Sequence, residues 1–454
     1  MSRSKKNRLL VNLAIITFIV LGTVIAIRIA KGYRPSLQNK NFNGTGLLAA
    51  SSHPKQAQVF INGNLTTTTD DTIYLNPDTY QVEIIKPGFH SWKKDIPTKK
   101  ELVSLATARL FPTIPSTTPL TFYQAQNTTL NPDGTTVAFV ITNAPFDADN
   151  GLYTLSLNNN LLGSTNLTQL ADLSTHLYQK ATLLWSPEGN QILSVFTQND
   201  TITSSHLLNT KGFNSSRDIN DTTVRLSLLL SQWQEQLQKM DQPAFNQLPD
   251  FMQDLLSQNS VNVYFSPDQE KVFYTPTQDT TLPENTIGSQ LPNINSTPEQ
   301  RTLTANQTYL YDFKEGTNYH LPFVITSSTT KKTLLAIPIT PTNPDNATQS
   351  ADQTSTQIEP LSQDPLTLIQ ELKNQTDSLQ TTNLSWYPDS DHLIITSPNK
   401  IDIIEYDGLN LTTIIETNII ESFSAPSPDG NRLVILTNLN QKPEQQNLIS
   451  LDLK

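Results

Sequence analysis

The sequence of 454 residues contains no cysteine, only 15 glycines and only six histidines. The absence of cysteine excludes structural disulfides, iron–sulfur clusters, thiolate zinc sites and a cysteine nucleophile. No histidines have the close spacing of a metal motif such as H-E-x-x-H. Glycine-rich phosphate-binding motifs and the G-x-S-x-G turn of serine hydrolases are also missing. The sequence therefore predicts no cofactor, and it lacks the usual motifs of kinases, NTPases and serine hydrolases.

Acidic residues are absent from one end of the chain. Residues 1–69 contain nine Lys and Arg but no Asp or Glu. The other 385 residues carry 21 basic and 41 acidic side chains, a net charge of about −20. This balance disfavours binding to phosphate backbones and favours solubility, cations or basic partners. We expect no nucleic-acid partner.

One long apolar run is present, the 19 uncharged residues from Leu9 to Ile27. At about 1.5 Å of rise per residue, a helix of this length crosses a ~30 Å hydrocarbon layer. A short basic segment precedes the run and is easily retained inside the cell. We predict a cytoplasmic stub at 1–8, a transmembrane helix at 9–30 and a linker at 31–45. The rest of the chain would then lie outside the cytoplasm. The absence of cysteine favours a prokaryotic source, since large secreted vertebrate domains usually carry cysteines.

Two other interpretations of this run compete with the anchor. A cleaved signal peptide is disfavoured because the run is longer than a usual signal sequence and Ile25-Ala26-Ile27-Arg28 offers no small-x-small cleavage site. A buried helix of a soluble domain would need one polar face, which the run lacks. We favour the uncleaved anchor.

Short strands broken by turns follow the linker. Asn62-Gly63 between two apolar runs indicates a tight hairpin, because its turn needs positive φ. An alternating strand at 80–84 and a proline–glycine turn at 86–89 come next. This order resembles the PEGA domain of bacterial and archaeal surface proteins over residues 46–110, although the tetrapeptide that names the family is only half kept, at 54–57. The resemblance implies a small β-sandwich without catalytic residues, which acts as a cell-surface spacer or adhesion module.

A repeated hairpin motif dominates the chain from residue 120 onward. In each of five copies, an aromatic or apolar residue comes before Ser/Asn-Pro-Asp-Gly or a close variant, and an apolar strand follows. Proline fixes φ and glycine supplies the strained corner, so each copy predicts a β-hairpin. The motif residues are Pro132, Asp133, Gly134, Pro187, Pro267, Asp268, Pro388, Asp389, Pro428, Asp429 and Gly430.

Such hairpins recur, with a second pair of strands, in the blades of β-propellers. The signature resembles the WD-like repeats of the TolB-type propeller over residues 120–454. The motif prolines are 55, 80, 121 and 40 residues apart, so only the last gap is a bare blade and the others hold insertions. With a degenerate blade around 332–339, we predict about six blades. The predicted fold class is mainly β: a transmembrane helix, a small PEGA-like sandwich and a β-propeller with helical insertions.

The insertions are expected near 221–260, 276–302 and 340–380. Apolar residues three or four apart predict a helix at 224–240 and a second, short one after Pro243. Asp364-Pro365 begins a third helix that extends to Leu372. Two stretches rich in Thr, Asn, Pro and Gln are predicted to be disordered or loosely draped loops, namely 278–302 and 340–357.

Two acidic patterns could carry chemistry. Asp147 and Asp149 alternate with small residues ahead of Gly151, as oxygen ligands do at the start of calcium loops. No Glu follows at the distance of a bidentate ligand, so we favour an acidic hairpin loop over a cation site. The motif aspartates could serve as paired carboxylates for acid–base chemistry. Their repetition in every hairpin favours a role in the turns instead.

Two aromatic residues lie on the predicted inserted helices, which no propeller blade requires. Trp233 either packs its helix back on the propeller, which we favour, or presents a hydrophobic anchor to a partner. Phe251 occupies a similar place on the second helix. These two residues are the candidate partner-binding residues.

The predicted function is a non-enzymatic, membrane-anchored binding or scaffold protein. It would present the propeller on a PEGA-like stalk to another envelope protein or to a glycan. One alternative is a propeller enzyme, whose catalytic side chains would converge on the axis from several blades without forming a sequence motif. Another alternative is a purely structural spacer of the envelope. An exposed apolar patch at the helical insertion would favour the scaffold.

Overall fold

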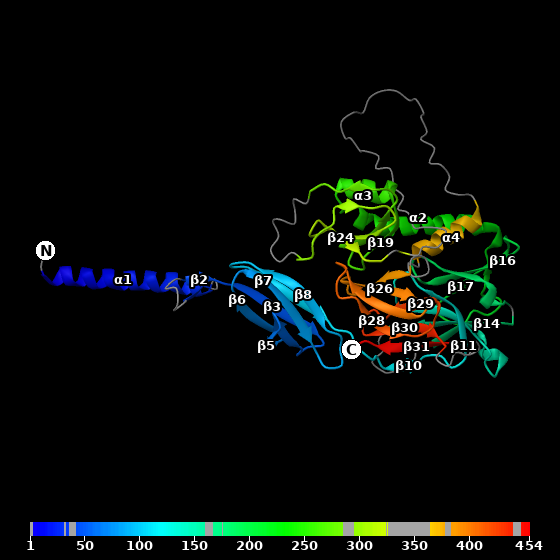
Figure 1. Ribbon diagram of the computed structural model, residues 1–454. Helices are drawn as coiled ribbons and strands as arrows, with labels where there is room; N and C mark the ends of the chain where they lie inside the picture. Colours follow the sequence, from blue (N-terminus) through cyan, green and yellow to red (C-terminus); the bar gives the residue numbers. More distant parts are fainter. Residues whose placement is uncertain are drawn as a thin grey trace, which may run out of the picture. The chain divides into compact units, whose positions relative to one another are not determined.

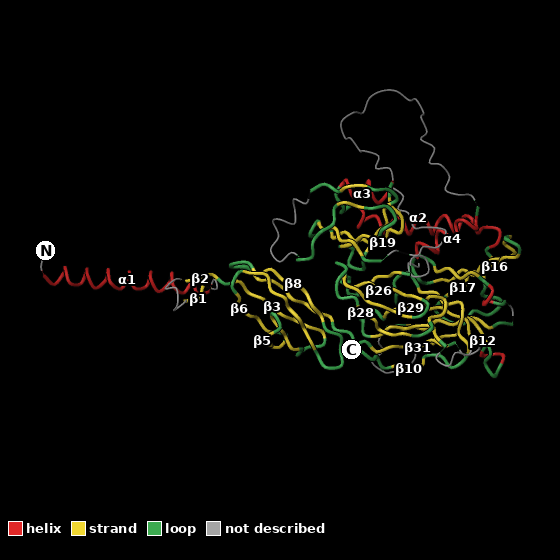
Figure 2. Tube along the Cα trace, in the orientation of Figure 1, coloured by secondary structure: helices red, strands yellow, loops and turns green. Residues whose placement is uncertain are grey.

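The chain is mainly β, as the sequence predicts, and it divides into two units. One unit comprises Met1–Thr113 with Thr286–Pro298, and the other comprises Ile114–Asn285 with Glu299–Lys454. The computed structural model (Figures 1 and 2) describes residues 3–30, 33–35, 42–158, 167–174, 176–284, 295–323, 325, 364–376, 383–438 and 446–454.

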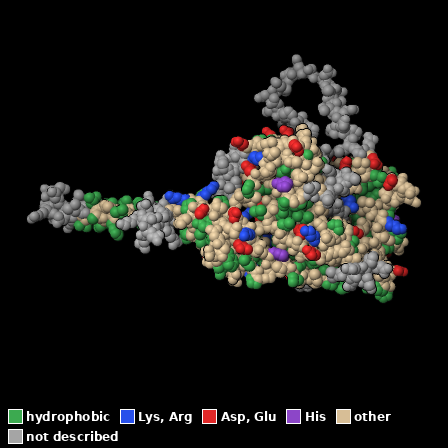
Figure 3. Space-filling model, in the orientation of Figure 1, with side chains coloured by type: hydrophobic (Ala, Val, Ile, Leu, Met, Phe, Trp, Pro, Cys, Tyr) green, Lys and Arg blue, Asp and Glu red, His purple; other side chains and the backbone are tan. Residues whose placement is uncertain are grey.

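The first unit begins with the helix α1 (Arg3–Ala30), which is 28 residues long. Every described side chain from Val11 to Ile27 is exposed, and Figure 3 shows apolar side chains along this stretch. The hydroxyl of Thr17 donates to the carbonyl four residues earlier, so the helix satisfies its own polar group. Within the part of the chain that was described, no helix combines the length and the apolar character of a membrane span. The membrane role of 9–30 stays a prediction.

The predicted linker at 31–45 holds a short ladder. Strand β1 (Tyr33–Pro35) pairs antiparallel with β2 (Phe42–Gly44), with Tyr33 opposite Gly44. Three-residue strands are too short to show an alternating pattern, so sequence periodicity could not reveal them. The linker is therefore partly regular structure.

A β-sandwich follows in the same unit. One sheet has the order β6-β3-β9 and the other has the order β5-β4-β7-β8. Alternate side chains from both sheets fill one core, which includes Leu48, Val59, Val82 and Trp92. The strands are β3 (Gly46–His53), β4 (Gln58–Ile61), β5 (Asn64–Thr68), β6 (Asp71–Leu75), β7 (Asp78–Ile85), β8 (Trp92–Thr98) and β9 (Val103–Arg109).

The turns of the sandwich match the local sequence. Asn62 (φ 49°) and Gly63 (φ 79°) join β4 to β5, and two positive φ angles define the tight hairpin turn predicted there. Gly88 (φ 84°) occupies the left-handed corner of the second predicted turn. In that turn the N–H of Phe89 donates to the carbonyl of Lys86 at 3.1 Å.

The described part of the second unit contains five four-stranded antiparallel sheets. Four of them take their strands in chain order. The first consists of β11 (Gln124–Leu130), β12 (Thr136–Thr142), β13 (Gly151–Ser156) and β14 (Leu167–Asp172). The second consists of β15 (Thr182–Trp185), β16 (Gln191–Gln198), β17 (Thr201–Asn209) and β18 (Asn220–Asp221). The third consists of β19 (Ser260–Phe265), β20 (Lys271–Pro276), β23 (Thr308–Asp312) and β24 (Thr317–Leu321). The fourth consists of β25 (Leu384–Trp386), β26 (His392–Ser397), β27 (Lys400–Glu405) and β28 (Thr412–Glu416).

The fifth sheet joins the two ends of this unit. Its order is β10-β31-β30-β29, so the first strand of the unit lies beside the last three. These strands are β10 (Thr117–Pro119), β29 (Ile419–Pro426), β30 (Arg432–Thr437) and β31 (Asn447–Asp452). Stacked four-stranded sheets closed by strands from both ends are the architecture of a β-propeller.

Neighbouring sheets pack through shared cores. The fifth and first sheets share a core that contains Leu436 and Phe139. The first and second share one with Leu152 and Trp185, and the third and fourth share one with Phe273. The described residues thus form five blades, and the candidate strand at 332–339 lies outside them.

The five signature turns share one hydrogen-bond pattern. The fourth residue of each turn has positive φ and donates its N–H to the carbonyl of the first: Gly134 to Asn131, Gly189 to Ser186, Gln269 to Ser266, Ser390 to Tyr387 and Gly430 to Ser427. In four turns the aspartate accepts the backbone N–H two residues further on, at 2.9–3.1 Å: Asp133, Asp268, Asp389 and Asp429. This pattern is turn chemistry, as favoured from the sequence.

Three helices interrupt the blades, close to their predicted positions. They are α2 (Leu226–Phe245), α3 (Asp250–Gln258) and α4 (Pro365–Thr376). α2 continues past its predicted end at 240 and includes Pro243, which lies in the last turn and so costs few intrahelical bonds. Asp364 caps α4 as predicted, since its carboxylate accepts from the N–H of Leu366 at 3.3 Å and from the hydroxyl of Thr367 at 3.0 Å.

Helices α2 and α4 lie side by side against the second sheet (Figure 1). Their buried residues, among them Leu230 and Leu368, pack on Leu193 of β16. α4 also reaches the third sheet, because the hydroxyl of Tyr264 donates to the carbonyl of Asn374 at 2.7 Å. A helix pair therefore connects the second and third sheets, whereas the other described neighbours contact each other directly.

The predicted loop at 278–302 is partly ordered. β21 (Thr280–Thr281) pairs with β22 (Thr302–Leu303) at its two ends. Leu282 and Leu303 are buried in the core of the third sheet, which explains why these flanks are fixed despite a polar composition. Residues 285–294 and the whole of 340–357 lie outside the described part of the chain.

Candidate functional site

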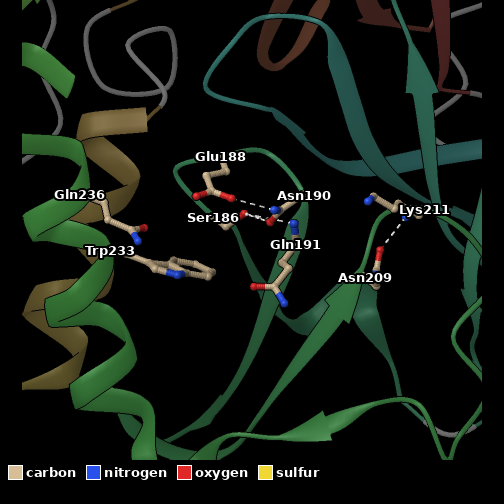
Figure 4. A pocket seen from close by; sticks show the side chains of 8 residues that line it. All are labelled: Ser186, Glu188, Asn190, Gln191, Asn209, Lys211, Trp233 and Gln236. Atoms are coloured by element: carbon tan, nitrogen blue, oxygen red, sulfur yellow. Dashed lines mark hydrogen bonds between the residues drawn. The ribbon is translucent and has the colours of Figure 1, made fainter. Parts of the chain in front are cut away.

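A pocket of about 240 Å³ lies where α2 meets the second sheet. Three parts of the chain line it (Figure 4): the signature turn between β15 and β16 with the first residue of β16, the end of β17 with the loop that follows it, and the middle of α2. The lining residues are Ser186, Glu188, Asn190, Gln191, Asn209, Lys211, Trp233 and Gln236.

Hydrogen bonds within the turn hold one wall of this pocket. The hydroxyl of Ser186 donates to Asn190 Oδ1 at 3.1 Å and accepts the backbone N–H of Gln191 at 3.1 Å. Asn190 Nδ2 donates to Glu188 Oε2 at 2.9 Å. Gly189 (φ 69°) allows the left-handed corner that turns the chain between them. The wall is therefore positioned before any ligand arrives.

Some other polar side chains that line the pocket make no hydrogen bond to the described part of the protein. Among the described residues, no partner is recorded for the side-chain amides of Gln191 and Gln236 or for the amine of Lys211. Figure 4 shows Gln236 and Trp233 extending from α2 towards the turn. Amides can donate and accept at once, so these groups can bind hydroxyl or amide groups of a ligand.

Trp233 contributes most of its surface to packing. Its side chain is only 5% exposed and belongs to the core formed by α2, α4 and the second sheet. This position agrees with the interpretation that Trp233 packs its helix on the propeller. The part of the indole that remains accessible borders the pocket (Figure 4). Its role in binding a partner stays a prediction.

Phe251 lies away from this pocket, on α3. It packs beside the core of the third sheet, with its ring edge-on to Tyr311 at 6.2 Å between centroids. Its position is that of a residue that attaches α3 to the blade. A role in binding a partner stays a prediction here too.

Asp147 and Asp149 form a single 3-10 turn between β12 and β13. Asn150 fixes this loop, because its Oδ1 accepts the N–H of Ala144 at 2.9 Å. In the described part of the chain, no three His, Asp or Glu side chains are grouped so that they could hold a metal ion. The geometry is that of a hairpin loop, the interpretation favoured from the sequence.

A close pair of histidines was not foreseen from the sequence. His176 and His206 are 30 residues apart in the chain, yet their ring centroids are 4.1 Å apart beside Phe196. Burial lowers the pKa of both rings, and the neighbouring His176 lowers that of His206 further, against an opposing effect of Asp221. Both imidazoles therefore favour the neutral form in the folded state.

His392 has the opposite electrostatic environment. It is buried, and its Nδ1 lies 2.9 Å from Oδ2 of the turn residue Asp389. Burial alone would lower the pKa of His392, but the carboxylates of Asp389, Glu405 and Asp391 outweigh burial and raise it. The motif aspartate of the fourth blade thus also stabilises a protonated histidine.

These two histidine sites predict pH effects of opposite sign on propeller stability. The raised folded pKa at His392 gives a contribution that is complete below an unfolded pKa of about 6.5 and is lost as pH rises through the folded value. The lowered pKa at His206 gives a contribution that is complete above about 6.5 and is lost as pH falls. His392→Gln should reduce the fall in Tm on the alkaline side, and His206→Gln should reduce it on the acid side. Calorimetry across this range measures both, and identical slopes in all three proteins would contradict the assignment.

The fold and site define a protein with an apolar N-terminal helix, a β-sandwich and a β-propeller that carries a polar pocket. Residues 45–112 match the family model of the PEGA domain, which confirms the resemblance for the sandwich. No curated protein matches the chain.

Several solved structures are similar to this chain. A putative TolB from Agrobacterium tumefaciens is 12% identical with a TM-score of 0.20, over 71% of this chain and 72% of that one. TolB from Acinetobacter baumannii is 11% identical with a TM-score of 0.21, over 82% of this chain and only 59% of that one. The hydrazine synthase of Kuenenia stuttgartiensis is 10% identical with a TM-score of 0.17, over 84% and 80%. The propeller assignment follows from the strand order of the five sheets rather than from these likenesses.

Proposed function

We propose that this chain is a membrane-anchored envelope protein of a prokaryote, which presents a propeller on a PEGA-like stalk and binds a glycan in the pocket beside Trp233. The observation that carries the ligand proposal is the pocket itself, with an indole and two uncommitted amides around one small space. The propeller would lie outside the cytoplasm, with the basic N-terminal stub inside.

The anchor is supported by α1. Its described side chains from Val11 to Ile27 are all exposed, and the large apolar ones are 44–79% exposed. Leaving so much contiguous apolar surface in water is unfavourable, by about 25 cal/mol per Å². The uncharged run from Leu9 matches the thickness of a bilayer core. The PEGA resemblance, which implies a cell-surface module, points to the same compartment.

The chemistry of the pocket supports a neutral, polar ligand. The volume is below the roughly 300–1,000 Å³ of pockets for drug-sized ligands, so one sugar unit of a longer chain suits it. The amides of Gln191 and Gln236 can pair with hydroxyls, and the small accessible part of Trp233 offers one apolar contact to a C–H group of a sugar. Glu188 and Lys211 balance each other in charge, so the site has no preference for an anion such as phosphate.

Intrinsic fluorescence should report sugar binding at this pocket. Oligomers of N-acetylglucosamine and of glucose serve as probes, because they differ in the amide that a ligand could offer to Gln191 and Gln236. We expect a saturable change in tryptophan fluorescence with at least one probe. Gln236→Ala should weaken binding roughly 5- to 10-fold, as expected for the loss of about 1–1.4 kcal/mol of hydrogen bonding at a partly exposed site.

Gln242→Ala is the matched control, because Gln242 lies on the same helix outside the pocket lining. It should bind both probes as the unchanged protein does. If neither probe binds, or if the two variants lose the same affinity, the glycan site is rejected. Turnover of a probe would favour the propeller enzyme instead, and an inert pocket would favour the structural spacer.

A further inference from the structure

One sheet of the sandwich carries apolar side chains on the face that points away from its core. Along β9 the residues alternate, with Ser104, Ala106 and Ala108 buried. The intervening Val103 and Leu105 are 38% and 55% exposed. A sheet with one face in water normally alternates apolar residues towards the core with polar residues towards the solvent. The outward apolar residues therefore need an explanation outside the sandwich core.

The strand register aligns these residues in rows across β6, β3 and β9, and each such row is called a rung here. Leu47 of β3 lies between Tyr74 of β6 and Val103 of β9, which makes the first rung apolar across all three strands. The second rung is mixed, since Ala49 lies between Thr72 and Leu105.

The third rung is polar, with Ser51 of β3 opposite Thr107 of β9 and a hydrogen bond of 3.3 Å between their hydroxyls. Apolar character thus declines along β3, from its first residue Gly46 towards its end. The apolar rung is the one nearest to the point where the chain arrives from α1. This gradient follows distance along the chain from the helix, which a random scatter of apolar residues would not.

The turn at the same end of the sheet is close to neutral. Lys99 and Lys100 of the β8–β9 turn are balanced by Glu101 in that turn and by Asp78 at the start of β7. The N–H of Glu101 donates to the carbonyl of Thr45 at 3.1 Å, which ties this turn to the start of β3. The surface therefore suits contact with an uncharged, apolar environment and has no charge that would favour an anionic or a cationic one.

We propose that this face, formed by Leu47, Tyr74, Val103 and Leu105 with Leu102 at its edge, docks on the lipid surface around the anchor. The inference rests on the proposed membrane role of α1. Only residues 31–45 separate that helix from β3, and 15 residues span at most about 50 Å when extended, so the sheet end stays within reach of the bilayer. Tyrosine at such a position favours the membrane–water interface, where its ring is apolar and its hydroxyl is hydrated.

The chain contains no cysteine, so a single introduced cysteine can be labelled without background. Leu105→Cys places an environment-sensitive fluorophore on the docking face. Leu65→Cys is the matched control, because Leu65 is 58% exposed but lies on β5 of the other sheet. Both full-length variants are reconstituted in neutral phosphatidylcholine vesicles that contain lipids with a nitroxide quencher near the headgroup.

We expect the label at 105 to be quenched at least threefold more than the label at 65. Adding Val103→Asp to the Leu105→Cys variant should remove most of that difference. Equal quenching at the two positions would overturn the docking, as would a label at 105 that is shielded from water but not quenched by lipid, which would mark a protein partner or a second copy. Flotation separates the two proposals: failure of the chain to float with vesicles rejects the anchor together with the docking, whereas flotation without selective quenching rejects the docking alone.

Discussion

A chain that stops at Gln446, before β31, should lose its folded propeller and keep its folded sandwich. β31 lies between β10 and β30 in the fifth sheet, which closes the propeller by joining strands from its two ends. Removing it takes away four almost fully buried side chains, which are Leu448, Ile449, Leu451 and Leu453. At about 1.5–3 kcal/mol for each buried side chain, the loss is about 6–12 kcal/mol, which is comparable to the whole stability of a typical domain.

Differential scanning calorimetry measures this result directly. The sandwich has a core of its own, so its unfolding transition should persist while the propeller transition disappears. The control is a chain that stops at Leu453 and lacks only the exposed Lys454, and it should unfold like the full chain. Two intact transitions in the chain that stops at Gln446 would show that the propeller folds without β31.

Phe273→Ala should destabilise the propeller by about 3–5 kcal/mol, the range for removing a buried phenylalanine. Phe273 is fully buried, and its ring lies 5.2 Å from that of Tyr264 and 5.8 Å from that of Trp386 in the next sheet. The third and fourth sheets are separated in the chain by residues 322–383, of which 326–363 lie outside the described part. The substitution therefore tests whether these sheets form one core despite that interval. Chemical denaturation followed by tryptophan fluorescence gives the change in unfolding free energy.

Phe213→Ala makes the same chemical change at a position that is 54% exposed. It should cost less than about 0.5 kcal/mol, as surface substitutions usually do. If the two variants lost equal stability, the third and fourth sheets would not share the core described here.

Features that depend on neighbouring residues were predictable from the sequence. The five signature turns follow from proline and an acidic residue, with glycine in three of them, within four positions, because turn conformation is decided by local sterics. The turn at Asn62-Gly63 and the capped start of α4 at Asp364 are local in the same sense. The helix α2 was predictable because its apolar residues repeat at helical spacing.

Features that combine distant residues were not predictable in this way. The pocket joins Glu188 in a turn to Gln236 on a helix, and no spacing in the chain indicates that they meet. The adjacent rings of His176 and His206 come from the segment before β15 and from β17. The strand β10 at 117–119 is too short to show a period, although it completes the last sheet. Pairing of remote segments is decided by tertiary packing, which a single sequence does not reveal.

The fifth sheet also determines the order in which the two units can fold during synthesis. Thr117 of β10 pairs with Leu451 of β31, so the two ends of the propeller meet only after β31 has been synthesised. Closing so long a loop adds little to the equilibrium cost, which grows by only about 0.6 kcal/mol per doubling of length. The effect of this closure is on the folding rate, because non-local strand pairing is slow and leaves apolar edges exposed until it is complete. The sandwich is synthesised before the propeller and can fold while the propeller is still open, so the synthesis of β31 determines when the propeller becomes a stable domain.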